Sequence, residues 1–201
     1  MSGCTKRVIT ICKELGLEYE LVQVEMMKGA HKAPEYIENF QPFGAVPVLE
    51  DADGTKIYES RAIGRYLTAK YGKDTGLLPS STDAKAYGLF EQAASIEYSS
   101  FDPSAVGLTR ERILHPMLKK PTNEALASYY EATLKTKLEG YERVLAKQKY
   151  LAGDYITLID LFHLPYGTSV NKINPELIGS KPNLKRWWDD ISSRESWKAL
   201  D

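Results

Sequence analysis

The pattern of apolar and polar residues changes near residue 72, and before that point short helical and strand-like stretches alternate. Residues 5–16 place apolar side chains at helical spacing and end on Gly16, a typical residue after a helix. Residues 19–25 carry Leu21, Val22 and Val24, which suits a buried strand paired in parallel with a neighbour. The other expected elements are a short helix over 34–40, strands at 46–50 and 56–58 joined by a turn at Asp53-Gly54, and a helix over 60–71 that Ser60 caps.

After residue 82 every pattern is helical. Asp83 opens a long helix that breaks near Phe101-Asp102-Pro103, and Thr157 and Asp160 have the spacing of a capping box. Residues 73–82 contain Gly76 and Pro79 and interrupt the periodicity. We therefore expect a mixed α and β unit over 1–72, a linker over 73–82 and an all-helical unit over 83–201. The inward-facing residues expected in the helical unit are Leu89, Phe90, Ala93, Ala94 and Ile96, then Leu126, Tyr129, Tyr130, Leu134, Leu138, Tyr141 and Leu145, and Trp187, Trp188 and Trp197 in one terminal helix over 182–200.

Two short stretches point to a binding site. Pro47 stands between Val46 and Val48, and a proline removes one hydrogen-bond donor from a strand edge. If the Val46–Pro47 peptide bond is cis, the amide and carbonyl of Val46 project outward and can pair with a short extended peptide. Glu59-Ser60 then offers a hydroxyl and helix-start N–H groups to a carboxylate of that peptide. The alternative is an ordinary strand, turn and capped helix.

Composition and charge narrow the classes of function. The net charge of −1 gives no electrostatic case for nucleic acid or an anionic membrane. We find no apolar stretch that predicts a membrane span or a signal peptide, so the cytoplasm is the expected location. Cys4 and Cys12 are expected to be free thiols. His115 and His163 lack a second ligand at metal spacing, so no metal site is predicted.

Four strings, together with the two-part pattern, resemble the cytosolic glutathione transferases, and among them the phi class. They are KGAHK at 28–32, NFQPFG at 39–44, ESRAI at 59–63 and LAGD at 151–154, and the resemblance spans nearly the whole chain. It implies an α+β thioredoxin-like N-terminal domain followed by an all-α C-terminal domain. It also implies conjugation of glutathione to hydrophobic electrophiles, a role in detoxification, possible reduction of organic hydroperoxides, glutathione as cosubstrate with no other cofactor, and a homodimer in which Arg61 resembles an interface residue.

The resemblance also assigns roles to residues. Ser2 matches the residue that activates glutathione, a role that suits a hydroxyl because a thiol of pKa about 8.5 is mostly protonated at neutral pH. His31 and Lys32 match the residues that hold the glycine carboxylate, whereas Ala45 departs from a common glutamine. The remaining assignments are Val46 and Pro47 for the cysteinyl group, Glu59 and Ser60 for the γ-glutamyl group, and Tyr98, Phe101 and Val106 for the electrophile site.

The resemblance raises one structural expectation and leaves alternatives open. In the family a further strand precedes the Ser2 segment and lies between the strands expected at 19–25 and 46–50. We therefore expect an N-terminally shortened chain whose 19–25 segment has no neighbour to pair with. The alternatives to an enzyme are an assembly module like the one that begins elongation factor gamma subunits, and a carrier of apolar ligands. The chain lacks the long extension that follows the helical unit of the former.

Overall fold

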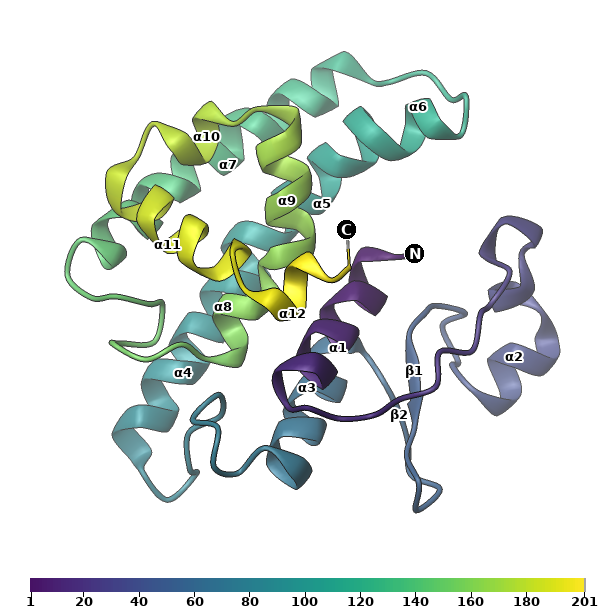
Figure 1. Ribbon diagram of the computed structural model, residues 1–201. Helices are drawn as coiled ribbons and strands as arrows, with labels where there is room; N and C mark the ends of the chain where they lie inside the picture. The colour runs from purple at the N-terminus through teal and green to yellow at the C-terminus, as the bar shows by residue number, and fades with distance from the viewer. Residues whose placement is uncertain (201) are drawn as a thin grey trace.

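The strands and the helical bundle occupy different sides of the computed structural model, which describes residues 1–200 (Figure 1). The first part of the chain forms α1 (Gly3–Glu14), η1 (Met26–Lys28), η2 (Ala30–Lys32), α2 (Pro34–Asn39), β1 (Val48–Glu50), β2 (Lys56–Tyr58) and α3 (Ser60–Tyr71). The second part forms α4 (Ala84–Ile96), η3 (Glu97–Phe101), α5 (Asp102–Thr109), η4 (Arg110–Leu114), α6 (His115–Met117), α7 (Glu124–Leu145), α8 (Leu158–Phe162), α9 (Leu164–Ile173), α10 (Glu176–Gly179), α11 (Pro182–Ser192) and α12 (Glu195–Lys198). The division of the chain into 1–72, 73–82 and 83–201 stays a prediction. The last of these units includes Asp201, which lies outside the described residues.

The predicted hairpin is confirmed. β1 and β2 pair antiparallel, with Val48 opposite Tyr58 and Leu49 opposite Ile57. Leu49 and Ile57 pack against a small cluster of buried residues that joins α1 to α3, made of Val8, Cys12, Ile63 and Leu67. The local turn and the apolar side chains that alternate along the strands are enough to specify this element.

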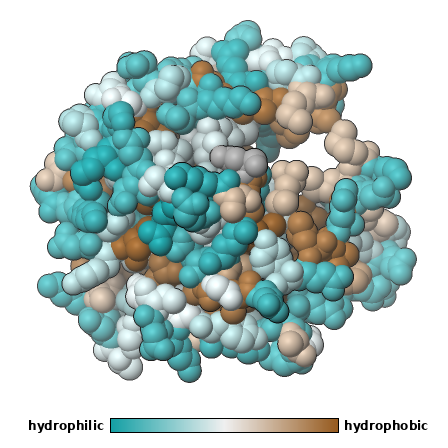
Figure 2. Space-filling view, viewed as in Figure 1, coloured by the Kyte–Doolittle hydropathy of each residue, from teal (hydrophilic) through white to brown (hydrophobic). Residues whose placement is uncertain are grey.

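The predicted strand at 19–25 is wrong. This segment is extended but pairs with no strand, and Leu21 and Val22 are 51% and 75% exposed. Within residues 1–200 the sheet has two strands, β1 and β2, and neither is hydrogen-bonded to this segment, which confirms the expectation that it has no neighbour to pair with. Figure 2 shows apolar surface over this side of the molecule, where the segment passes the hairpin.

The long helix that begins after Asp83 does not break at Pro103. Asp83 caps α4, and the helix continues through the π-helical turn η3 into α5. In that turn the N–H of Asp102 donates to the carbonyl of Glu97, five residues earlier, and Pro103 follows as one of the first residues of α5. The missing proline N–H is therefore placed where a new helical segment tolerates it.

Several smaller expectations for the helical part are also corrected. Ser193 and Arg194 divide the terminal helix into α11 and α12, because the backbone of Arg194 is extended. Leu89, Leu126 and Tyr129 are exposed rather than inward-facing. The three tryptophans are buried as expected, and the capping box between Thr157 and Asp160 is confirmed at the start of α8.

Helix α1 connects the two parts of the molecule. It packs on α3 through Val8 and Cys12, while Ile11 belongs to the main core of the helical part. At its C-terminal end, both carboxylate oxygens of Glu14 accept hydrogen bonds of 2.6 Å from Arg194, next to α12. Helix α1 is thus fixed both to α3 and to the helical part, and this gives its N-terminal end a defined position.

Candidate active site

Ser2 is the N-cap of α1. Its Oγ accepts the N–H of Thr5 at 3.0 Å and lies 2.7 Å from the Thr5 hydroxyl. The N–H groups of Gly3 and Cys4 have no hydrogen-bond partner among residues 1–200, as is usual in a first helical turn. When Thr5 donates its hydroxyl proton to Ser2, the Ser2 proton is free for a neighbouring anion. This end of the helix therefore combines a free hydroxyl donor with the positive end of the helix dipole.

A second helix start, that of α3, carries Glu59 and Ser60. Glu59 is the N-cap, with φ of 70°, and Ser60 is the first helical residue, so the expectation that Ser60 caps the helix is wrong. A positive φ at a non-glycine residue is strained and usually marks a functional position. The N–H groups of Ser60, Arg61 and Ala62 have no hydrogen-bond partner in the described part of the chain. The start of α3 therefore presents donors for an anion.

Arg7 joins these two helices. It is 1% exposed; its Nη1 donates to Ser60 Oγ at 2.8 Å, and its Nε donates to the carbonyl of Phe162 at 3.0 Å. Its Nη1 also lies 3.8 Å from Cys4 Sγ. Arg7 was not among the site residues predicted from the sequence, although its place one turn before Ile11, on the apolar face of the helix, indicates a buried side chain.

A cluster of two arginines and two carboxylates surrounds this link. Arg61 donates to both oxygens of Glu97 at 2.7 Å and lies 2.6 Å from Asp102, while Arg7 lies 3.6 Å from Asp102 and 3.9 Å from Glu97. Burial would raise the pKa of Glu97, but the hydrogen bonds from Arg61 and the positive charges around it lower that pKa below its ordinary value. The cluster is balanced in charge and binds η3 and α5 to α1 and α3.

The strand predicted over 46–50 is shorter than expected: β1 begins at Val48, so the segment predicted to bind a peptide lies just before the strand. The Val46–Pro47 bond is cis. The N–H and carbonyl of Val46 have no hydrogen-bond partner within residues 1–200. The Tyr36 hydroxyl donates to the Ala45 carbonyl at 2.9 Å and fixes the chain just before this edge. Val46 is therefore free to pair with an extended ligand.

His31 and Lys32 lie against the loop that leads into this edge. Lys32 Nζ donates to the carbonyl of Phe43 at 3.2 Å, and a Cβ on Gly44, whose φ is +61°, would meet the His31 carbonyl oxygen at 2.8 Å. The Nδ1 atom of His31 is buried and has no hydrogen-bond partner in the part of the chain that the structure describes. The structure thus brings 31–32 next to 43–45, so that two cationic or polar side chains border the Val46 edge.

The three residues proposed for the electrophile site have different surroundings. Tyr98 is 65% exposed and borders a hollow of about 250 Å³ together with Arg61 and Arg65. Phe101 is a core residue, with its ring centroid 4.7 Å from that of His163. Val106 lies half-buried on α5, one turn after Asp102. Asp102, one turn before Val106, lies 3.6 Å from Arg7, and this contact relates α5 to α1.

The molecule is hollowed beside the N-terminal end of α1. Figure 2 shows an opening between the end of the α5–α6 helix and the part of the chain that contains α2, and the N-terminus lies beside it (Figures 1 and 2). The hydroxyl of Tyr166 on α9 lies 3.8 Å from Cys4 Sγ, and burial raises the pKa of this tyrosine. The opening therefore has the N-terminal end of α1 and the α5–α6 helix on one side and the part of the chain that contains α2 on the other.

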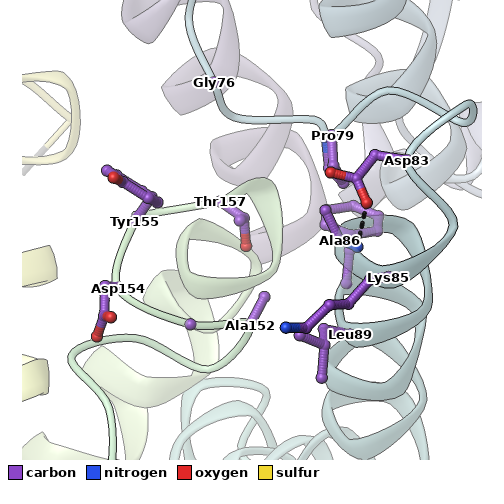
Figure 3. A pocket seen from close by; sticks show the side chains of 12 residues that line it. Gly76, Pro79, Asp83, Lys85, Ala86, Leu89, Ala152, Asp154, Tyr155 and Thr157 are labelled. Carbon is purple, nitrogen blue, oxygen red and sulfur yellow. Dashed lines mark hydrogen bonds between the residues drawn. The ribbon is translucent and has the colours of Figure 1, made fainter.

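A separate hollow of about 240 Å³ lies between the start of α4 and the loop after Leu151 (Figure 3). Lys85, Ala86 and Leu89 line one side, and Ala152 and Tyr155 line the other. None of the predicted site residues lines it. Within residues 1–200 no group of three or more His, Cys, Asp or Glu side chains is arranged to hold a metal, and no helix is long and apolar enough to span a bilayer.

Comparisons with known proteins agree with the two-part architecture. The family profile described as "Glutathione S-transferase, N-terminal domain" matches residues 1–70, and "Glutathione S-transferase, C-terminal domain" matches residues 108–195. A protein of Arabidopsis thaliana named glutathione S-transferase PM239X14 is 61% identical over 187 residues, which is 93% of this chain and 86% of that protein. Glutathione S-transferase hmp2 of Hypomyces subiculosus is 42% identical and covers 96% of this chain and 91% of its own length.

Solved structures give the same result. Glutathione transferase F7 from Populus trichocarpa superposes with a TM-score of 0.92 at 34% identity and covers 100% of this chain and 93% of its own. Glutathione S-transferase I from maize, in complex with an atrazine glutathione conjugate, superposes with a TM-score of 0.90 at 29% identity, covering 100% and 92%. The fold is therefore a thioredoxin-like N-terminal part followed by a helical C-terminal part, as expected. The chain belongs to the glutathione S-transferase family and is most like its phi class.

Proposed function

We propose that this chain binds glutathione along the Val46 edge and ionises its thiol at the N-terminal end of α1. The thiolate is then added to a hydrophobic electrophile in the opening between the two parts. The observation that carries this proposal is the pairing of two helix starts, at Ser2 and at Ser60, whose hydroxyls and N–H groups are available to a negatively charged ligand. The relatives named as glutathione S-transferases support an enzyme and give no support to an assembly module or a carrier.

The three residues of extended glutathione meet the hydrogen-bond donors of the site in the order of the tripeptide. The γ-glutamyl carboxylate lies at the start of α3, where Ser60 and the free N–H groups donate to it. The cysteinyl backbone pairs with the N–H and carbonyl of Val46, beside Pro47, and the glycine carboxylate is held by His31 and Lys32. The thiol then faces Ser2. Ala45 offers no side-chain donor at the glycine end, so these two residues hold that carboxylate.

The chemistry of the thiol explains why a serine suffices. Conjugation needs the thiolate, and the attacking sulfur belongs to glutathione, so Ser2 acts as a hydrogen-bond donor and is not itself the nucleophile. A hydrogen bond to an ionised group contributes about 1.5–3 kcal/mol, which corresponds to about one to two pKa units of the thiol. Reaction with an organic hydroperoxide uses the same thiolate. The electrophile lies between Val106 and the start of α1, and Tyr98 and Phe101 contribute through the helix that carries them. We also propose a cytoplasmic homodimer that acts in detoxification, as in the family.

The test is conjugation of glutathione to 1-chloro-2,4-dinitrobenzene across pH 6–9, with a glycine in place of Ser2. Ser2→Gly removes the hydroxyl but costs the N-cap only a few tenths of a kcal/mol, so α1 remains formed. We expect kcat/KM at pH 7 to fall about 10- to 150-fold, with the pH profile displaced upward by about one to two units. Ser180→Ala, which removes an exposed hydroxyl on the far part of the chain, is the matched control. A Ser2→Gly enzyme with the wild-type rate and profile would exclude the role of Ser2.

A further inference from the structure

The proposed mechanism gives no role to Arg7, a charged side chain that is 1% exposed and lies next to the site. Its guanidinium reaches from α1 to Ser60 on α3 and to the carbonyl of Phe162 on α8. Within residues 1–200 its Nη2 makes no hydrogen bond, and it faces Asp102 and Glu97 at 3.6 and 3.9 Å. A guanidinium can only donate, so each of these contacts fixes the role of its partner.

The hydrogen bond from Arg7 determines that the hydroxyl proton of Ser60 points away from Arg7. Ser60 is 4% exposed, and its Oγ accepts from Arg7 at 2.8 Å. Because the oxygen accepts this bond, the single hydroxyl proton must be donated elsewhere, and the described residues 1–200 offer no acceptor for it. The hydroxyl of Ser60 therefore keeps its proton for a ligand, beside the free N–H groups at the start of α3.

The same side chain also connects this anchor to the start of α1. Ser2 and Arg7 are five residues apart on one helix, which is about 7.5 Å along its axis. Because Arg7 bonds to Ser60 from a fixed position on α1, the hydrogen bond sets the position of the Ser60 hydroxyl relative to Ser2. A ligand that spans both serines thus meets them in a defined arrangement.

The charge of Arg7 matters as well. Arg7 and Arg61 balance Glu97 and Asp102 within one buried cluster. Loss of Arg7 leaves two carboxylates against one guanidinium beside Ser60. An incoming carboxylate would then meet excess negative charge in a region of low polarity.

We propose that Arg7 is a positioning residue for the γ-glutamyl carboxylate of glutathione, acting through the hydroxyl of Ser60. This inference rests on the proposed function. Arg7 does not touch the ligand; it holds Ser60 as an outward donor and keeps the local charge balanced. Its removal therefore weakens the binding of glutathione more than it slows the chemical step.

A double-mutant cycle tests this coupling. Arg7→Met, Ser60→Ala and the double variant are compared with wild type for the Kd of glutathione by calorimetry, for KM and kcat, and for thermal unfolding. We expect each single change to raise Kd and KM about tenfold, because each removes a hydrogen bond that serves a charged group. The double variant is expected to be about 10- to 30-fold weaker than wild type. An effect near 100-fold, the product of the two single effects, means independent action and overturns the proposal.

Two further variants separate positioning from a general structural effect. Arg7→Lys keeps the positive charge and an ammonium that can reach one of the partners of Arg7, so it should bind glutathione about threefold more tightly than Arg7→Met does. It replaces Arg7→Met in the cycle if that variant does not fold. Arg65→Met removes another arginine, on α3, that packs on the rings of Phe90 and Phe162 without touching Ser60. Unchanged affinity in Arg65→Met supports the proposal, and equal losses in both arginine variants overturn it.

The outcomes also distinguish this inference from the function on which it rests. Wild-type protein that neither binds glutathione nor conjugates it removes the proposed function, and the role of Arg7 with it. Wild-type protein that binds glutathione while Arg7→Met keeps the same Kd removes only the role of Arg7. A lower melting temperature and a lower kcat with an unchanged KM would likewise mark Arg7 as purely structural.

Discussion

His163 provides a quantitative test of how the helical core responds to pH. Its ring is buried among aromatic side chains, with centroids 4.7 Å from Phe101 and 5.1 Å from Trp187. Nδ1 lies 2.7 Å from the carbonyl of Ile159, which can only accept, so Nδ1 carries the proton. Nε2 then accepts the hydroxyl of Tyr141 at 3.0 Å. Both contacts require the neutral imidazole, and burial lowers the pKa of His163 from 6.5 to about 4.

This lowered pKa makes the fold less stable in acid. Above pH 6.5 the imidazole is neutral in both the folded and the unfolded chain, so it adds no pH dependence. As the pH falls from about 6.5 to about 4, the unfolded chain takes up a proton that the folded chain excludes. A difference of about 2.5 pKa units at about 1.36 kcal/mol per unit gives a total loss of about 3 kcal/mol, most of which has developed by pH 4.5.

The perturbation is His163→Gln, which removes the titration and keeps amide groups that can meet the Tyr141 hydroxyl and the Ile159 carbonyl. Urea unfolding, followed by tryptophan fluorescence at one protein concentration, gives the free energy of unfolding of both proteins between pH 7.5 and 4.5. Carboxylates affect both proteins alike, so the difference between them isolates His163. We expect the stability advantage of wild type to shrink by about 2–3 kcal/mol over this range. His115→Gln, at a partly exposed histidine, is the control. A difference that stays constant within about 0.5 kcal/mol, the usual scale of surface effects, would refute the reasoning.

Two predictions concern packing and capping in the helical part. A Cβ on Gly167 would come within 2.3 Å of the Trp188 ring, so Gly167→Ala should lower the free energy of unfolding by about 1–3 kcal/mol. Gly88 lies in open space within α4, so Gly88→Ala should instead raise the free energy of unfolding by about 0.5–1 kcal/mol. Urea unfolding measures both changes. Asp160 is fully buried and accepts four hydrogen bonds, one of them from Trp187. Asp160→Asn places an N–H donor against these donors, so it should lower the free energy of unfolding by roughly 2–4 kcal/mol in the same assay. A loss below about 1 kcal/mol would contradict this account.

The features that the sequence predicts well are those encoded within a few residues. The hairpin follows from two alternating stretches around Asp53-Gly54, and the capping box follows from Thr157 and Asp160, three residues apart. The same holds for part of the candidate site. The cis bond after Val46 and the helix start at Glu59 each form within a few residues, and each leaves its own backbone N–H groups available. Local hydrogen-bonding rules therefore recover the half of the site that would hold a peptide.

The features that the sequence predicts poorly depend on a distant partner. The 19–25 segment has strand-forming residues, yet a strand also needs a hydrogen-bonded neighbour, and in residues 1–200 neither β1 nor β2 pairs with it. Phe101 has the spacing of a cleft residue as well as that of a core residue, and the neighbours Tyr141 and His163 decide that it is buried. Neither outcome follows from the residues within one turn of each position.

The acidic pair at the site shows why regular helical spacing missed an essential contact. Glu97 and Asp102 are five residues apart, which in an α-helix would place them about 140° apart around the axis. The π-turn η3 adds one residue to a single turn, so both carboxylates face Arg61 and Arg7. The two arginines in turn neutralise the carboxylates in a place where an unpaired charge would be costly. A pattern read at 3.6 residues per turn assigns Glu97 and Asp102 to different faces of the helix, and the irregular turn is what brings both carboxylates to the two arginines beside Ser60.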